Sequence, residues 1–178
     1  MVAHHSMLQL IATGDHKLMR KVNKWPAPRW VRLAAIAATR AGDGWLWYLV
    51  GLAVLLLGGE NRFSAIAAAG SAAVVGIGMF MVLKKVSGRK RPCEIEPHVW
   101  AHVLPPDQFS FPSGHTITAF AVAITLGTFY PLLLGALLFF AVCIAISRVL
   151  LGMHFLSDVI VGALLGTGLA LSSHAVFA

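Results

Sequence analysis

The sequence is short of charged residues. Lys, Arg, Asp and Glu make up 12% of its 178 residues, about half of the share found in soluble domains. Hydrophobic residues make up 58%. This composition excludes an ordinary soluble globular domain, and we expect an integral membrane protein.

Acidic residues and cysteines are scarce as well. Seven Asp and Glu stand against 14 Lys and Arg, which gives a net charge of +7. The basic residues flank apolar runs, so the expected partners are membrane lipids or an anionic substrate, and nucleic acid is not expected. The two cysteines, Cys93 in a polar stretch and Cys143 in an apolar one, predict neither a disulfide nor a metal site. The apolar run 7–12 is too short for a cleavable signal peptide.

The first 43 residues contain no apolar run of about 20 residues, the length that a membrane-spanning helix needs. Basic and apolar residues alternate on both sides of a Pro-Ala-Pro break at residues 26–28, and Trp25 and Trp30 lie beside basic residues. This combination is typical of the membrane interface. We therefore expect short interfacial amphipathic helices in residues 1–43 and a transmembrane core in residues 44–178.

Five apolar runs follow. Their approximate bounds are 44–58, 63–83, 113–130, 131–151 and 157–177. Glycines interrupt the runs, and Gly162 and Gly166 have the spacing that lets transmembrane helices approach closely. The expected fold class is all-α: a multi-pass transmembrane bundle in which five to six helices span or partly span the membrane.

The unusual polar residues gather in two segments. With five spans, the segment between the second and third spans lies on the same membrane face as the segment between the fourth and fifth. The first segment contributes Lys84, Arg91 and His115, and the second contributes Arg148, His154 and Asp158. We predict that these side chains converge on one site.

A tight polar turn, Pro112-Ser113-Gly114-His115, opens directly onto the third apolar run. Ser113 suits a helix N-cap, and its neighbours favour a turn. A helix that begins here presents free N–H groups and the positive end of its dipole to an anion. His115 in the first turn could pass a proton to that anion.

Arg148 interrupts an apolar run, which costs on the order of 2.5–3.5 kcal/mol in a membrane. Such a residue usually faces a polar cavity, and snorkelling from a helix end is the alternative. His154 and Asp158 are four residues apart, which predicts one shared helical face and a carboxylate that holds one imidazole nitrogen.

Three cations, a helix N-terminus, two histidines and one carboxylate suit a tetrahedral oxyanion. One acidic residue is too few for magnesium or calcium, and we expect no metal and no other cofactor. Phosphate chemistry without a metal needs a protein nucleophile and a general acid, roles that two imidazoles can fill. The spacing does not decide which imidazole has which role.

The same residues resemble the three-part signature of the type 2 phosphatidic acid phosphatases, relatives of bacterial acid phosphatases and vanadium haloperoxidases. The motif Lys-x6-Arg-Pro matches Lys84 to Pro92, and Pro-Ser-Gly-His matches residues 112–115. The motif Ser-Arg-x5-His-x3-Asp matches Ser147 to Asp158. Every motif position is filled, and the motifs follow in order.

This resemblance implies a membrane lipid phosphatase with a role for each residue. It implies that His154 attacks phosphorus to form a phosphohistidine, that Asp158 orients His154, and that His115 protonates the leaving oxygen. It also implies that phosphoryl charge is stabilised by Lys84, Arg91, Ser113, Gly114 and Arg148. Outside the motifs, we interpret Arg89 and Lys90 as headgroup contacts and assign no role to His98, His102 and His174.

The resemblance does not single out one substrate, because phosphatases with these motifs act on different lipid phosphates. We expect undecaprenyl diphosphate, in cell-wall biogenesis, with phosphatidylglycerophosphate, phosphatidic acid and lipid A as alternatives. A vanadate-dependent haloperoxidase and a non-catalytic lipid carrier are the readings from other functional classes.

The side of the membrane is open to two interpretations. In the five-span count, every lysine and arginine except Arg62 lies on the active face, and the positive-inside rule puts that face in the cytoplasm. The resemblance implies a bacterial inner-membrane protein whose site faces outward. We expect the outward orientation, because several of the basic residues belong to the site itself.

Overall fold

The computed structural model describes residues 7–100 and 107–178. Its helices are α1 (Met7–Asn23), α2 (Arg29–Ala41), α3 (Trp45–Leu57), the 3₁₀ turn η1 (Gly59–Asn61), α4 (Arg62–Ser87), α5 (Pro92–Ile95), α6 (Gly114–Phe129), α7 (Pro131–Leu150) and α8 (Leu156–Phe177). In these two ranges the only β-type pairing is a single bridge between Lys90 and Phe109. The all-α prediction is confirmed.

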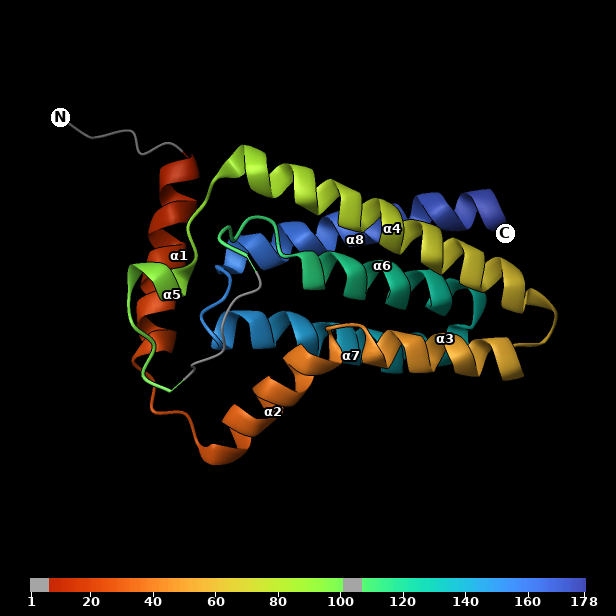
Figure 1. Ribbon diagram of the computed structural model, residues 1–178, viewed down its shortest axis with the longest axis horizontal. Coiled ribbons are helices and arrows are strands. Elements are labelled where there is room, and N and C mark those ends of the chain that lie inside the picture. Colours follow the sequence, from red (N-terminus) through yellow and green to blue (C-terminus); the bar gives the residue numbers. More distant parts are fainter. Residues whose placement is uncertain (1–6, 101–106) are drawn as a thin grey trace.

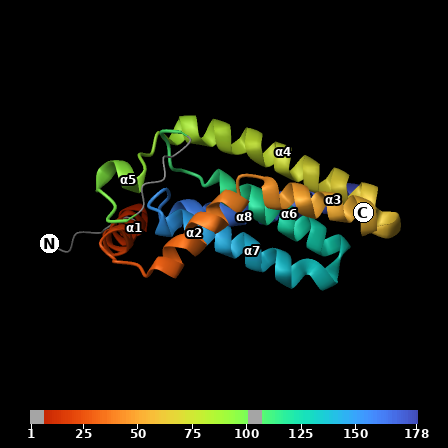
Figure 2. The same ribbon diagram turned by 60° about the horizontal axis from the view of Figure 1, so that its bottom comes forward.

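Five of the described helices form an elongated bundle, and α1 lies across one of its ends (Figures 1 and 2). The bundle consists of α3, α4, α6, α7 and α8, which correspond to the five apolar runs. Helices α7 and α8, and α4 together with η1, are long and apolar enough to cross a membrane. The bent pair of α2 and α3, at 57° to each other, passes the same test as one broken span. The multi-pass transmembrane prediction is therefore confirmed.

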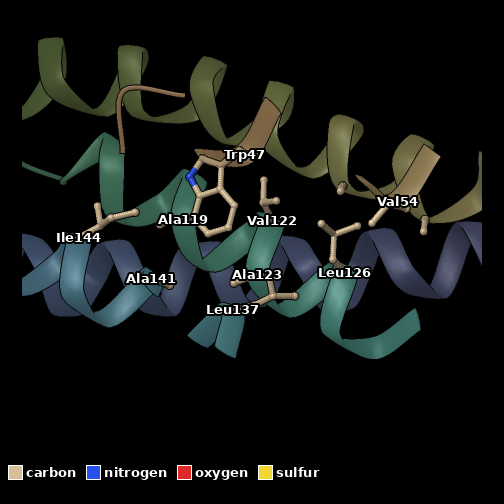
Figure 3. Packing of buried hydrophobic residues seen from close by; sticks show 11 residues of the cluster. Trp47, Val54, Ala119, Val122, Ala123, Leu126, Leu137, Ala141 and Ile144 are labelled. Atoms are coloured by element: carbon tan, nitrogen blue, oxygen red, sulfur yellow. The ribbon is translucent and has the colours of Figure 1, made fainter. Parts of the chain in front are cut away.

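Helix α6 is the centre of the bundle. It packs against α4, α7 and α8, and Ala119, Val122 and Leu126 on it belong to a core that also contains Trp47 of α3 and Leu137 of α7 (Figure 3). With 16 residues it is shorter than an ordinary span. Because other helices surround it, its ends are covered by protein and need not reach the lipid headgroups themselves.

The close approach of α8 to α6 depends on two glycines. A Cβ atom on Gly166 would lie 2.5 Å from the carbonyl oxygen of Ile117, and one on Gly162 would lie 3.0 Å from the carbonyl oxygen of Ser113. Such distances are shorter than van der Waals contact, so no larger residue fits without moving a backbone. The predicted packing role of this glycine pair is confirmed.

Helix α4 is longer than predicted. We expected the second apolar run to end at about residue 83, but the helix continues to Ser87 and ends at Gly88, whose φ of 57° is in the left-handed region. Lysine is a good helix former, whereas glycine in this conformation is the common helix terminator. Lys84 therefore lies on the last turn of α4, where the helix holds its direction.

The helices predicted in the N-terminal segment are present as α1 and α2. Helix α2 is more than a surface element, because it packs against α7 and buries Ala35 and Thr39. It leads into α3 through a short turn at residues 42–44, where Gly44 has a φ of 121°. This turn brings the N-terminal segment up to the same end of the bundle as the polar motifs.

Candidate active site

The polar motifs meet at the end of the bundle that α1 covers. The last turns of α4 and α7 and the first turns of α6 and α8 all lie there (Figure 1). Nη1 of Arg91 is 3.3 Å from Nε2 of His154 and donates to the carbonyl oxygen of Met153 at 2.8 Å. The two motif-bearing segments, 63 residues apart in the chain at this contact, are therefore in direct contact.

Two of the cations share a carboxylate that we did not predict. Asp107 accepts from Nζ of Lys84 at 2.5 Å and from Nη2 of Arg91 at 2.7 Å. Burial raises the pKa of this carboxyl, but the hydrogen bonds and charges of Lys84 and Arg91 outweigh burial and hold the pKa below its ordinary value. Asp107 is thus an anion held between two fixed cations. It matches no motif, and its sequence neighbourhood carries no signal of this contact.

Arg148 is buried inside the protein. Its side chain is almost inaccessible, with the whole residue 2% exposed, and Nη1 donates to the hydroxyl of Thr39 in α2. Nε and Nη2 are buried and have no hydrogen-bond partner among the residues that the structure describes. Unpaired donors on a buried guanidinium are costly. Snorkelling is excluded by this burial, and the two donors match the oxygens of a tetrahedral anion.

His154 and Asp158 lie side by side, but not on one helix as predicted. His154 belongs to the turn before α8, which begins at Leu156, and Asp158 lies in the first turn of α8. Nδ1 of His154 is 3.6 Å from Oδ2 of Asp158, and both side chains are buried. Oδ2 also accepts the N–H of Phe155 at 2.8 Å. The carboxylate is thus fixed at the helix N-terminus and faces Nδ1, which has no hydrogen-bond partner among the described residues.

The environment keeps His154 neutral. Burial lowers the pKa of its imidazole well below the ordinary value, and the positive charges of Arg148, Arg91 and Lys84 act in the same direction. A neutral imidazole has a free lone pair on one nitrogen. With Nδ1 facing Asp158, that nitrogen is Nε2, which faces the cations. The geometry suits a nucleophile directed at a bound anion.

Arg89 is part of the site, which corrects our interpretation of it as a headgroup contact. Its Nη1 donates to Oδ1 of Asp158 at 2.6 Å, and its Nη2 donates to Oδ2 of Asp15 in α1 at 2.7 Å. The partner Asp15 is 74 residues away in the chain. Spacing therefore offered no signal beyond the position of Arg89 inside the Lys-x6-Arg motif.

The second histidine also has a carboxylate partner that we did not predict. Nε2 of His115 lies 2.7 Å from Oδ1 of Asp43, which belongs to the turn between α2 and α3. The side chain of Asp43 is 55% exposed. The 72 residues between the two explain why the sequence did not reveal the pair.

Ser113 is at the N-cap position, as predicted, but its side chain makes no capping hydrogen bond in the described part of the chain. Its hydroxyl oxygen instead accepts from Thr116 at 2.9 Å. The hydroxyl proton of Ser113 is therefore directed elsewhere and can serve an anion, together with the free N–H groups of the first turn of α6. The N–H of Ser113 donates to the carbonyl oxygen of Asp158, which joins the starts of α6 and α8.

Among the histidines outside the motifs, His16 packs edge-to-face against Phe155 beside the site. His98 contacts the carbonyl oxygen of Leu150 at 2.9 Å and supports the turn after α7, and His174 packs against Phe129. His102 lies outside the described residues. Cys93 and Cys143 are free thiols, as predicted.

An apolar groove leads into the site. Its volume is about 710 Å³, and side chains of α3, α4 and α6 line it. Asp43 and His115 lie among its lining residues, next to Gly114. Tyr48, Leu52 and Val74 on its walls are more than half exposed, so the groove opens sideways between α3 and α4, toward the lipid of a surrounding membrane.

Comparisons with known proteins point to one family. A family model described as the PAP2 superfamily matches residues 63–178, which is more than half of the chain. The decaprenylphosphoryl-5-phosphoribose phosphatase of Mycobacterium tuberculosis is 37% identical over 123 residues, which cover 69% of this chain and 66% of that protein. The protein of the same name from Mycolicibacterium smegmatis is 33% identical over 76% of this chain and 83% of its own length.

Two solved structures share the fold. The structure of LpxE from Aquifex aeolicus has a TM-score of 0.72 at 24% identity and covers 97% of this chain and 98% of its own. The transmembrane PAP2 type phosphatidylglycerolphosphate phosphatase from Bacillus subtilis has a TM-score of 0.71 at 22% identity, over 97% and 87% of the two chains. The M. tuberculosis relative is matched over just under two thirds of its length.

Proposed function

We propose that this chain, which belongs to the PAP2 superfamily, is an integral-membrane phosphatase that removes the terminal phosphate from a polyprenyl-linked lipid. The observation that carries the proposal is the buried guanidinium of Arg148. Two of its donors are unpaired among the described residues, and they lie in the same cluster as Arg91 and the neutral His154. A phosphoryl group supplies the oxygens that these donors lack.

The first step of the proposed mechanism transfers the phosphoryl group to the protein. Lys84, Arg91, Arg148, the Ser113 hydroxyl and the Gly114 N–H hold the phosphoryl oxygens. Nε2 of His154 attacks phosphorus while the bond to the leaving oxygen breaks. The electron pair goes to that oxygen, which takes a proton from His115. Asp158 holds the Nδ1–H of His154 and stabilises the positive charge that develops on the ring.

The second step releases phosphate. Water attacks the phosphorus of the phosphohistidine, and His115, now unprotonated, accepts a proton from the water. The P–N bond breaks and its electron pair returns to Nε2. Both histidines then have their starting protonation, so the steps balance over one turnover without a redox change.

The groove supports a lipid as the leaving group. His115, which would protonate the leaving oxygen, is a lining residue of the apolar groove. The leaving oxygen belongs to the part of the substrate that carries the lipid. A prenyl or acyl chain in the groove thus places the leaving oxygen beside the proton donor and the terminal phosphate beside the cations.

Two polyprenyl substrates are the candidates to compare. Undecaprenyl diphosphate is the substrate that we expect from the resemblance of the motifs. The two mycobacterial relatives, at 37% and 33% identity, are named for decaprenylphosphoryl-5-phosphoribose, and they favour a polyprenyl phosphosugar that loses a sugar phosphate. Both candidates have a long prenyl chain and a terminal phosphate, and they differ in what lies between.

The test is phosphate release by the purified full chain in detergent. Undecaprenyl diphosphate and decaprenylphosphoryl-5-phosphoribose are compared with phosphatidylglycerophosphate, phosphatidic acid and lipid A. We expect kcat/KM to be highest for one of the polyprenyl substrates, and His154→Ala and His115→Ala to abolish release while the protein still folds. Preference for a diacyl lipid would overturn the polyprenyl assignment, and full turnover by either variant would overturn the mechanism.

The other functional classes give different results in the same preparation. A haloperoxidase would contain vanadium after purification and would oxidise bromide with peroxide, whereas a lipid carrier would bind these lipids and release no phosphate. The complete set of nucleophile, acid and cations in one cluster favours the phosphatase.

We further propose that the protein lies in a bacterial inner membrane with the site on the outer face, and that residues 1–43 form an interfacial segment beside the core of residues 44–178. Single cysteines placed in the segment 94–100, in a variant without Cys93 and Cys143, test the orientation. Labelling by an impermeant thiol reagent on intact cells is expected. Labelling only after the cells are opened would place the site in the cytoplasm.

A further inference from the structure

Asp15, a buried carboxylate of α1, contacts the first turn of α8, although the two lie 142 residues apart in the chain. Oδ1 of Asp15 accepts the N–H of Ser157 at 3.1 Å, and Oδ2 accepts the Ser157 hydroxyl. The side chain of Asp15 is 4% exposed, although α1 is an amphipathic helix at the edge of the molecule. Burial of a carboxylate is costly unless it is paired, and its pairing partner is Arg89.

Arg89 divides its guanidinium between two carboxylates. Nη2 donates to Asp15, and Nη1 donates to both Ser157 and Asp158. The ring of Phe155 lies 4.1 Å from the guanidinium carbon and keeps its plane in place. Asp158 is the carboxylate that faces His154, so a continuous chain of contacts runs from α1 to the imidazole.

On the basis of the proposed phosphatase function, we propose that Asp15 is a positioning residue that acts through Arg89 and Asp158 on the nucleophile His154. Asp15 lies outside the residues 63–178 that the family model matches. The N-terminal helix would then be a working part of the catalytic centre and not only a membrane attachment.

The physical reason is a balance of charge. With Asp15 present, one guanidinium is shared by two carboxylates, and the group has a net negative charge beside His154. Without Asp15, the Arg89 cation is balanced by Asp158 alone. The tighter pair draws the carboxylate toward Arg89 and away from Nδ1 of His154, which is already 3.6 Å from it. His154 then loses its orientation and the negative charge that stabilises its developing positive charge.

The main experiment substitutes Asp15 in the full chain. We expect Asp15→Asn to lower kcat by about 10-fold or more, as is typical for the loss of a group that orients a ligating or reacting histidine, with KM unchanged. Asp15→Glu, which restores the carboxylate, should recover most of the rate. The matched control is Glu94→Gln, which removes an exposed carboxylate at the same end of the bundle and should leave kcat unchanged. An unchanged kcat for Asp15→Asn would overturn the proposal.

A double-mutant cycle separates positioning from simple stabilisation of α1. In an Arg89→Gln background, Asp15→Asn should change kcat less than 2-fold, because the path through Arg89 is already broken. If the losses in kcat from the two substitutions multiply in the double variant, Asp15 does not act through Arg89 and the proposal is wrong.

The titration of His154 gives a readout that does not depend on turnover. The charged groups around it are Lys84, Arg91, Arg148 and Asp158. Removing one negative charge from the Asp15–Arg89–Asp158 group should lower the pKa of His154 further, so its titration and the acidic limb of kcat/KM should move to lower pH. NMR of histidine-labelled protein in detergent, assigned with His154→Gln, measures this shift. An unchanged His154 titration in the Asp15→Asn variant would overturn the positioning role of Asp15. Failure of the wild type to release phosphate would instead overturn the proposed phosphatase function, and the NMR titration would still decide whether Asp15 acts on His154.

Discussion

The two histidines of the site have carboxylate partners of opposite kinds. His154 and Asp158 are four residues apart, fully buried and enclosed by the ends of α7 and α8. His115 and Asp43 are 72 residues apart, and Asp43 is largely exposed at the mouth of the groove. The buried pair suits a nucleophile, which must keep one geometry. The open pair suits an acid–base residue, which gives a proton to the leaving oxygen in the first step and takes one from the attacking water in the second.

The largest effect should come from the buried pair. His154→Ala removes the proposed nucleophile, and we expect kcat to fall by at least about 10³-fold, as for other enzymes that lose a nucleophile. Phosphate release from the preferred lipid measures the loss, and incubation with radiolabelled substrate should leave no label on the variant. A labelled His154→Ala protein would show that another residue carries the phosphoryl group.

For the open pair, the loss in kcat on substitution of His115 should depend on the leaving group of the substrate. His115→Asn should lower kcat on a lipid substrate by about 10²–10⁴-fold, the usual contribution of a general acid. With an aryl phosphate such as p-nitrophenyl phosphate, whose leaving oxygen needs no proton, the loss in the phosphorylation step should be much smaller. Burst kinetics separate this step from hydrolysis. Equal losses on both substrates would assign His115 to binding and not to proton transfer.

Asp43 should matter less than Asp158. Because Asp43 is exposed, solvent screens its charge, and we expect Asp43→Asn to lower kcat by only about 3- to 10-fold, whereas Asp158→Asn should cost about 10²-fold by analogy with other orienting carboxylates. Both variants are measured on the same lipid with their folded fractions matched. The contrast between the two pairs is lost if Asp43→Asn has the larger effect.

The smallest effect should be a gain in apparent affinity. Asp107 occupies Lys84 and Arg91 and competes with the substrate phosphate for them. Asp107→Asn should therefore lower KM by about 2- to 5-fold, within the range of a weakened partly exposed ion pair, with little change in kcat. Inhibition by inorganic phosphate should strengthen by a similar factor. A higher KM would mean that Asp107 holds the two cations in place for the substrate.

The motifs could be recognised in the sequence because the residues of each motif lie within about a dozen positions of one another. The run of apolar segments predicted the five bundle helices, and Gly162 and Gly166 predicted the close contact of α6 with α8. The direction of Arg148 into the protein also followed from its position in an apolar run. The predicted shared helical face of His154 and Asp158 did not, because a backbone turn at Gly152, whose φ is 66°, places His154 before α8 and not on it.

The partners of these residues could not be read in the same way. Asp15, Thr39 and Asp43 lie in the N-terminal segment, far from any motif, and reach the site only because α1 and α2 fold back across its end. A carboxylate in a surface helix has the same sequence pattern whether it faces water or an arginine.

The sequence by itself determined that this chain is a membrane helical bundle and which six polar side chains share one of its faces, because the period of the helix and the length of a span leave few alternatives. Only the tertiary structure decided which carboxylate each cation and each imidazole contacts. Those contacts depend on distances of a few ångströms between helices that are far apart in the chain, and charge interactions within that range depend on how the helices pack.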